Sequence, residues 1–263
     1  MYKALTIAGS DPSGGAGIEA DIKTMSALGV YAMVSIVSVV AENTRRVVSL
    51  LDMPGWIIKD QIDSVFEDIT PDAVKVGMLS GPEQMDAVRD RLEYYKPKNV
   101  VVDPVMYAKN GDPLMHEDAV SFLIDNILPL STVLTPNIPE AEKITGMRIT
   151  DVDEMEKGAG KILSMGPEAV LLKGGHHIGD AIDVLVTQNG TFKFKTKRIN
   201  TKNTHGTGCT LSSAIASFLA KGYSLEDATK EAKDYVTGAI ENALELGKGC
   251  GPTNHFYALW NKD

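Results

Sequence analysis

The most informative chemical pattern in the sequence is a pair of glycines at the start of an amphipathic segment in its last third. Residues 203–210 read Asn-Thr-His-Gly-Thr-Gly-Cys-Thr, and Leu211, Ala214, Ile215 and Phe218 follow at helical spacing. The glycines are therefore predicted to lie at a helix start, where free backbone N–H groups and the positive end of the helix dipole can hold a phosphate. No Gly-Lys-Ser/Thr follows, so this is not a Walker motif. A glycine-rich helix start without a ligand is the alternative.

A lysine at the end of a predicted strand offers a second group for phosphate. Lys173 follows the apolar run 169–172 and precedes two glycines. A lysine in this position can neutralise a polyphosphate as a point charge, although a single lysine is more often simply solvated. The neighbouring pair His176 and His177 suggests a metal at first sight. Adjacent residues of an extended chain point to opposite sides and no third ligand follows, so we interpret both histidines as loop residues.

Two carboxylates could complete a site for a phosphate-bound metal. Asp103 ends the apolar run 100–102, and Glu140 begins a predicted helix within the block Thr-Pro-Asn-Ile-Pro-Glu-Ala-Glu at 135–142. Magnesium binds through one or two carboxylates together with substrate phosphates and water, so these two acids suffice if they converge. Viewed singly, Asp103 is a turn residue before proline and Glu140 a favourable charge at a helix N-terminus.

The segment Gly-Ala-Gly-Ile-Glu-Ala at 15–20 fits the dinucleotide pattern G-x-G-x-x-A. In a dinucleotide fold the first glycine follows the strand at once, whereas here Gly15 comes seven residues after Ala8. Glu42 could mimic the ribose-binding acid of such a site. Hydride transfer would still leave the second glycine turn, Lys173 and the two acids unexplained. ATP with Mg²⁺ explains all of them.

Short apolar runs alternate with amphipathic ones along the chain, which predicts βαβ units. We expect an α/β fold with a mostly parallel sheet and helices on both faces. Asn189-Gly190 between two β-rich runs predicts a hairpin. Expected strands are 4–8, 32–40, 73–76, 99–103, 132–134 and 169–173, and expected helices are 16–28, 56–69, 82–95, 140–145, 152–165, 209–220 and 224–246.

Composition narrows the class of protein further. The chain has 263 residues, 43% of them hydrophobic, which favours one domain over 1–263. Its 35 acidic against 26 basic residues give a net charge of −9, so nucleic acid is an unexpected partner. No basic leader or membrane-length apolar run is present, and we expect a cytoplasmic protein. Two cysteines, Cys209 and Cys250, are too few for a disulfide framework.

Six blocks, in order along nearly the whole chain, resemble the hydroxymethylpyrimidine/phosphomethylpyrimidine kinases of thiamine biosynthesis, in the ribokinase-like superfamily. They read Ala-Gly-Ser-Asp-Pro-Ser-Gly-Gly-Ala-Gly at 8–17, Val-Gly-Met-Leu at 76–79, Val-Val-Asp-Pro-Val-Met at 101–106, Thr-Pro-Asn-Ile-Pro-Glu-Ala-Glu at 135–142, Leu-Lys-Gly-Gly-His at 172–176 and Asn-Thr-His-Gly-Thr-Gly-Cys at 203–209. The first and last blocks mark this branch and its vitamin B6 kinase relatives. The resemblance implies a ribokinase-like three-layer fold with a small β-hairpin, and a homodimer.

The resemblance also implies a role for individual residues. On the acceptor side, Gly9, Asp21 and Glu42 would contact the pyrimidine, with Met78 and Val105 as apolar wall. On the phosphate side, the implied roles are Mg²⁺ binding for Asp103 and Glu140, ATP binding for Lys173, Asn137 and Thr207, an anion hole for Gly206, Thr207 and Gly208, and a proton acceptor for Cys209. A thiol at a helix N-terminus is expected to have a lowered pKa, which suits a base. A small buried helix residue is the plainer interpretation of Cys209.

One position departs from the family pattern. The family typically has Ala-Gln-Asn-Thr where this chain has Glu42 in Ala-Glu-Asn-Thr at 41–44. A carboxylate can accept from an amino group, but it cannot donate to a ring nitrogen unless it or the ring is protonated. Three functions follow as hypotheses: a two-step pyrimidine kinase, a pyridoxal or pyridoxine kinase of vitamin B6 salvage, and a nonenzymatic pyrimidine or nucleotide sensor.

Overall fold

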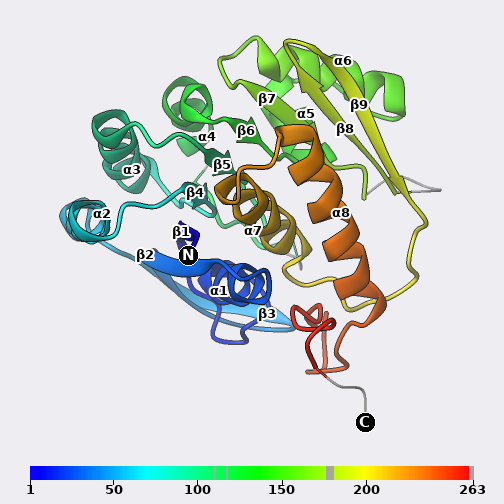
Figure 1. The fold of residues 1–263 in the computed structure, drawn as a ribbon, viewed down its shortest axis with the longest axis horizontal. Coiled ribbons are helices and arrows are strands. Elements are labelled where there is room, and N and C mark those ends of the chain that lie inside the picture. The colour runs from blue at the N-terminus through cyan, green and yellow to red at the C-terminus, as the bar shows by residue number, and fades with distance from the viewer. Residues whose placement is uncertain (109–110, 117, 176–180, 261–263) are drawn as a thin grey trace.

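The computed structural model describes residues 1–108, 111–116, 118–175 and 181–260, and its middle layer is one mixed sheet (Figure 1). Within these residues the sheet has nine strands in the order β3-β2-β1-β4-β5-β6-β7-β8-β9. Neighbours from β2 to β7 run parallel, while β3, β8 and β9 join antiparallel at the two edges. The strands are β1 Lys3–Gly9, β2 Tyr31–Asn43, β3 Arg46–Asp52, β4 Ala73–Val76, β5 Val100–Val102, β6 Val133–Leu134, β7 Ala169–Leu172, β8 Ala181–Thr187 and β9 Gly190–Thr196.

Helices cover both faces of this sheet, so the fold has three layers (Figure 1). Helices α1, α7 and α8 cover one face, and α2, α3, α5 and α6 pack on the other. The main helices are α1 Gly17–Ala27, α2 Gly55–Asp68, α3 Pro82–Tyr95, α5 Ile138–Thr145, α6 Val152–Leu163, α7 Thr207–Ala220 and α8 Leu225–Glu241. A short irregular stretch follows α4 Ala119–Phe122, through a π turn at Leu123–Ile127 and a 3-10 turn at Leu128–Leu130.

The two hydrophobic layers follow from side-chain alternation along the buried strands. In β4, Ala73 packs with α7 and α8, whereas Val74 and Val76 pack with α2 and α3. Strands covered on both faces read as continuous apolar runs, and Val100–Val102 is an example. The parallel strands thus end together under helix layers on both sides, and the polar residues that follow them meet at one edge of the sheet.

The expected α/β fold is confirmed, and most elements lie within a few residues of their predicted bounds. The sequence pattern missed β3, which pairs antiparallel with β2, and β2 itself continues to Asn43. Polar residues interrupt both stretches, which hides their alternation. The last helix was predicted to reach Leu246, but α8 ends at Glu241. Beyond it Leu244 N donates to Pro252 O, so the chain turns back instead of continuing the helix.

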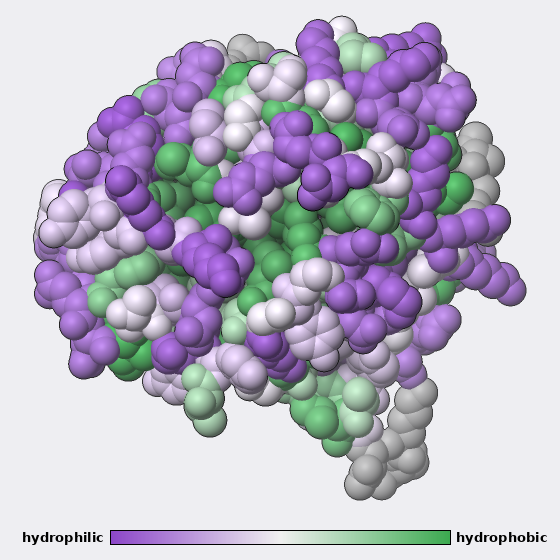
Figure 2. Space-filling model, turned by 45° about the horizontal axis from the view of Figure 1, so that its top comes forward, coloured by the Kyte–Doolittle hydropathy of each residue, from purple (hydrophilic) through white to green (hydrophobic). Residues whose placement is uncertain are grey.

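The face of the molecule shown in Figure 2 is largely hydrophilic. Hydrophilic side chains cover most of the face shown in Figure 2, with hydrophobic residues visible between them near its middle. In the part of the chain that the structure describes, no helix combines the length and apolar character needed to span a bilayer.

Candidate active site

A cleft of about 590 Å³ opens beyond the carboxyl ends of the parallel strands, at the start of α7. This is where ligands bind in open α/β sheets. Ten residues singled out from the sequence line it: Glu42, Asp103, Val105, Asn137, Glu140, Lys173, Gly206, Thr207, Gly208 and Cys209. Gly9, Asp21 and Met78 do not line it. His176 and His177 lie outside the described residues.

The glycine turn at the start of α7 has the backbone that the sequence predicted for a phosphate loop. Gly206 is the N-cap residue with φ 75°, a left-handed conformation that favours glycine. A Cβ atom there would collide with the carbonyl oxygen of Gly15, so the two glycine turns pack backbone against backbone. Among the described residues no side chain caps this helix, and Thr207 N makes only a long 3.4 Å bond to Thr204 O, so the helix start can still bind an anion.

Lys173 and Asp103 face this turn as an ion pair. The Lys173 Nζ lies 2.7 Å from Asp103 Oδ1, and Thr135 Oγ1 donates to the same oxygen at 3.2 Å. Burial opposes the charge on Lys173, but the carboxylates of Asp103 and Glu140 outweigh it and raise the pKa of the lysine. A Cβ atom on Gly208 would lie 3.2 Å from Asp103 Oδ2 and 3.5 Å from Lys173 Nζ. The cation, the carboxylate and the helix start therefore meet at one point.

Glu140 is positioned by a capping box at the start of α5. The Asn137 side chain accepts from Glu140 N at 2.9 Å, and Glu140 Oε2 accepts from Asn137 N at 2.7 Å. Burial raises the pKa of Glu140 to about 7, with Lys173 opposing and Asp103 adding to the rise. The two acids expected to share a metal thus line one cleft, with Lys173 paired to Asp103.

Cys209 lies in the cleft one residue beyond the glycine turn, but its thiol is not activated. Desolvation raises the pKa of Cys209 to about 12; Lys75 opposes this, and Asp21 and Asp103 add to it. The expectation of a lowered pKa was wrong, because loss of hydration outweighs the nearby cation and the helix start. The thiol is neutral at physiological pH in this state.

Asp21 was expected against the acceptor, and this stays a prediction; in the structure it lies in a buried hydrogen-bond network. Its carboxylate is buried and accepts from Thr6 Oγ1 at 2.6 Å, Lys75 Nζ at 2.8 Å and Ser213 Oγ at 2.6 Å. This network ties α1 to β4 and α7 below the cleft. Gly9 is buried next to Met78, since a Cβ on it would lie 2.8 Å from Met78 Cε.

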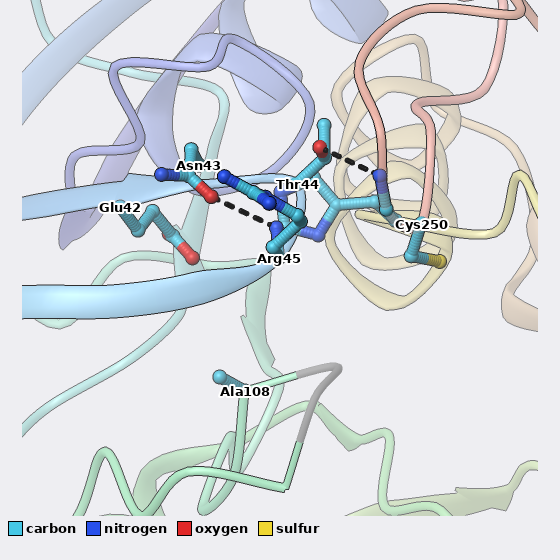
Figure 3. Close-up of a pocket in the computed structure, with 8 residues that line it drawn as sticks. Glu42, Asn43, Thr44, Arg45, Ala108 and Cys250 are labelled. Atoms are coloured by element: carbon cyan, nitrogen blue, oxygen red, sulfur yellow. Dashed lines mark hydrogen bonds between the residues drawn. The ribbon is translucent and has the colours of Figure 1, made fainter.

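The end of the cleft where the acceptor is expected lies around Glu42, with a side pocket of about 300 Å³ (Figure 3). Glu42, Ala108 and His205 line both spaces. The pocket lies against the turn after β2, where Thr44 O accepts from Cys250 N at 2.9 Å. In Figure 3 the Glu42 side chain points into the space between this turn and Ala108.

Sequence reasoning missed the partners that hold these groups in place. His205 Nε2 lies 2.8 Å from Asp11 Oδ2, although the two residues are far apart in the chain. Asp11 before a glycine turn is a typical turn-forming acid, so its local role was predictable from the sequence. The contact of Asp11 with His205 was not predictable from the sequence, because it forms only when the start of α7 packs against the first turn. Lys75 gave one signal, a lone charge within the buried strand 73–76.

Comparison with known proteins agrees with this geometry. The family model described as phosphomethylpyrimidine kinase matches residues 11–254. The hydroxymethylpyrimidine/phosphomethylpyrimidine kinase of Bacillus subtilis is 44% identical over 258 residues, which cover 97% of this chain and 95% of that protein. The thiamine biosynthesis bifunctional protein ThiED of Geobacter sulfurreducens is 47% identical over 255 residues, and the chain spans about half of its length (52%).

Two solved structures have the same fold. The phosphomethylpyrimidine kinase of Clostridium difficile has a TM-score of 0.83 at 48% identity and covers 91% of this chain and 100% of its own. The pyridoxal kinase of Bacillus subtilis, solved as an ADP complex, has a TM-score of 0.92 at 36% identity and covers 99% and 100%. Because the family model matches residues 11–254 and the Bacillus subtilis relative is covered to 95% of its length, the chain belongs to the phosphomethylpyrimidine kinase family.

Proposed function

We propose that the protein is an ATP-dependent kinase that phosphorylates 4-amino-5-hydroxymethyl-2-methylpyrimidine and then converts the monophosphate to the diphosphate, in thiamine biosynthesis. The names of the relatives at 44–47% identity support this acceptor. Pyridoxal kinases of the same fold were solved with ADP and with AMP-PCP, which supports ATP as donor. A cytoplasmic location follows as part of the same proposal.

The observation that carries the proposal is the meeting of Gly208, Lys173 and Asp103 at the start of α7. Phosphoryl transfer asks the protein mainly to position the two reactants and to neutralise charge on the transferred group. The N–H groups at the start of α7 are suited to the phosphoryl oxygens, with Thr207 N held only by a long 3.4 Å bond to Thr204 O, and the ammonium of Lys173 is suited to the adjacent phosphates. The raised pKa of Lys173 keeps that ammonium charged through the neutral range.

The donor set fits a magnesium ion. Asp103 and Glu140 supply carboxylate oxygens, the ligand type that Mg²⁺ prefers. Among the described residues, Asp103 Oδ2 accepts a single long hydrogen bond of 3.5 Å, from Ser212 Oγ, so it has capacity for a cation or its water. When bound, Mg²⁺ would neutralise charge on the ATP phosphates. Since Glu140 must be ionised to bind a cation well, its pKa of about 7 makes metal affinity fall as the pH drops below neutral.

We propose Cys209 as the proton acceptor for the hydroxyl group of the first acceptor. With a pKa of about 12, only the small thiolate population can accept a proton, and that population grows about tenfold for each pH unit. The second step needs no such base, because the acceptor phosphate is already ionised near neutral pH. Cys209 therefore matters in the first step and much less in the second.

We also propose that the protein forms a homodimer. In it, a second copy of the chain covers the open edge of the sheet. Strand β3 is an edge strand, and Val48 and Leu51 on it are 60% and 66% exposed, with Val39 of β2 47% exposed. An exposed edge with large apolar side chains is typical of strands that need cover. Light scattering on the purified protein should give twice the mass of the 28.3 kDa chain. Leu51→Lys should lower the measured mass.

The proposed activity is tested by ADP release from Mg²⁺-ATP with three acceptors in parallel. Hydroxymethylpyrimidine and its monophosphate should both support turnover, and pyridoxal should be a poorer acceptor. Preference for pyridoxal would make the protein a vitamin B6 kinase, and turnover with none of them would favour the binding-only alternative.

A further inference from the structure

Asp183 and Lys233 form an ion pair in the wall of the cleft, and the proposed chemistry uses neither of them. Asp183 lies on β8 and Lys233 on α8, and the Lys233 Nζ lies 2.6 Å from Asp183 Oδ2. Only 9% of the lysine side chain and 6% of the aspartate side chain are exposed. A buried ion pair is often no more stabilising than apolar residues of the same size. The stability of the fold is therefore a poor explanation for this pair.

The second oxygen of Asp183 holds the chain at the end of β7. Asp183 Oδ1 accepts from Gly174 N at 2.9 Å, and this N–H belongs to the peptide group that follows Lys173. A Cβ atom on Gly174 would collide with Ile182 O, so the chain runs close against β8 at this point. A buried peptide N–H without an acceptor is costly. Asp183 thus fixes the peptide between Lys173 and Gly174.

The other side of Lys173 is held by the strand end that follows β6. Lys173 N donates to Pro136 O at 2.8 Å, and Lys173 forms a parallel bridge with Asn137. Both peptide groups around Lys173 are therefore bonded, one toward β6 and one toward β8. The side chain leaves this fixed backbone and ends 2.7 Å from Asp103 Oδ1. Supporting bonds of this kind keep a functional group within the narrow range of positions that its chemistry needs.

Lys233 has two possible tasks at this place. It can hold the Asp183 carboxylate in position, because a buried carboxylate without a cation would be uncompensated. Alternatively it can contact a phosphate itself, since it also lines the cleft. Its ammonium already lies 2.6 Å from Asp183 and is almost fully buried, which favours the first task.

We propose that Asp183 is a positioning residue for Lys173. It holds the peptide between Lys173 and Gly174 so that the ammonium of Lys173 is aimed at the phosphates of the nucleotide, and Lys233 keeps Asp183 in place. This proposal rests on the proposed function for the contact between Lys173 and those phosphates. It requires that Asp183 act on the nucleotide only through Lys173, and that binding of the pyrimidine not depend on it.

Two double variants of the full chain separate the hydrogen bond from the ion pair. Asp183→Asn with Lys233→Met removes both charges and keeps an oxygen for Gly174 N, whereas Asp183→Leu with Lys233→Met removes that oxygen as well. The first should keep kcat/KM for Mg²⁺-ATP within about threefold, since the hydrogen bond remains. The second should lose roughly 10–10²-fold, as a displacement of about 1 Å at a positioned group does. Affinity for hydroxymethylpyrimidine, measured by calorimetry, should stay the same in both.

Repeating the Leu/Met variant in a Lys173→Ala background tests whether Asp183 acts through Lys173. There it should cause no further loss beyond about twofold, because the group that it positions is gone. A purely structural role would give the same fold-loss in both backgrounds. Lys230→Met is a matched control, since Lys230 lies on the same helix in an exposed pair with Asp234 at 3.0 Å, and it should change nothing.

The same four-way comparison is made on the affinity for AMP-PCP, a nonhydrolysable ATP analogue, so that the test does not require turnover. Asp183→Ala with Lys233→Met gives a second variant without the acceptor, for use if the leucine variant does not fold.

The expected pattern of AMP-PCP affinities without turnover in the unchanged protein would overturn the kinase proposal and leave the role of Asp183 standing. Equal losses in the Asn/Met and Leu/Met variants would mean that the charge of the pair acts on the nucleotide directly. Equal losses with and without Lys173 would make the pair structural. Either result would overturn the positioning role, as would no binding of AMP-PCP to the unchanged protein.

Discussion

The two ends of the cleft differ in how their charges are satisfied. At the phosphate end, Lys173 is paired with Asp103 at 2.7 Å, and Glu140 accepts a backbone N–H within its capping box. At the other end, Glu42 has no such partner among the described residues, and its pKa of about 7 leaves it partly protonated near neutral pH. We propose that the phosphate end is preorganised before any ligand arrives, whereas the acceptor end is completed by the ligand.

This difference assigns the two parts of catalysis to different residues. Preorganised charges that need no rearrangement are what stabilises a transition state. A polar group that is satisfied only by the correct partner gives selectivity, because a wrong ligand leaves it unpaired. Substitutions at the phosphate end should therefore reduce turnover for every acceptor, and substitutions around Glu42 should change which acceptor is used.

The largest selective effect is expected at Cys209, which follows the glycine turn at the start of α7. Cys209→Ala should lower phosphorylation of the alcohol by roughly 10²–10⁴-fold and that of the monophosphate much less, as loss of a general base does. In the unchanged protein, the alcohol step should speed up as the pH rises above 8, because the thiolate population grows toward a pKa of about 12. Steady-state rates with both acceptors measure this.

Alanine is a good helix former of similar bulk, so Cys209→Ala should leave thermal unfolding nearly unchanged. Equal losses in both steps would mean that Cys209 shapes the phosphate loop, and a negligible loss would make it a packing residue. Either result would contradict its role as base.

A comparable but unselective effect is expected at Lys173. Lys173→Ala removes the cation proposed for the ATP phosphates and should lower kcat/KM for ATP by about 10²–10³-fold with either acceptor. Affinity for the pyrimidine, measured by calorimetry, should change little. The exposed Lys157 on α6 gives a matched control, since Lys157→Ala removes the same charge far from the cleft. Loss of pyrimidine binding with intact ATP binding would contradict this assignment and place Lys173 beside the pyrimidine.

The smallest effect is one of stability, and its sign follows from the pKa of Glu42. A carboxyl group whose pKa rises from 4.5 unfolded to about 7 folded makes the protein less stable as the pH increases through that range. Glu42→Gln removes this cost. After discounting for solvent screening, it should stabilise the fold by about 1–2 kcal/mol at pH 8, or about 2–6 °C in Tm, and not at pH 4.

Thermal unfolding across pH 4–8 tests this, with Glu93→Gln as the control that should show no such trend. A Glu42→Gln protein that is no more stable than its parent at pH 8 would mean that Glu42 is well solvated, and would weaken the contrast between the two ends.

The phosphate end was largely predictable from the sequence and the acceptor end was not. Asp103 and Lys173 each follow a buried strand, and Gly206 begins a helix, so the topology of an α/β sheet alone brings them to one edge. The pair Asp11 and His205 depends on two turns packing together through glycines, which no local pattern encodes. The raised pKa of Cys209 was equally unpredictable from the sequence, because it depends on how far the folded chain buries the sulfur.

The central claim is that one cleft performs both phosphorylations of the pyrimidine, and phosphorus NMR on a single reaction tests it most directly. Hydroxymethylpyrimidine incubated with Mg²⁺-ATP and the protein should give the monophosphate first and then the diphosphate, with two ATP consumed per pyrimidine. Adding EDTA should stop both steps. No phosphorylated pyrimidine, with ATP and Mg²⁺ in excess, would contradict the account, as would a reaction that ends at the monophosphate.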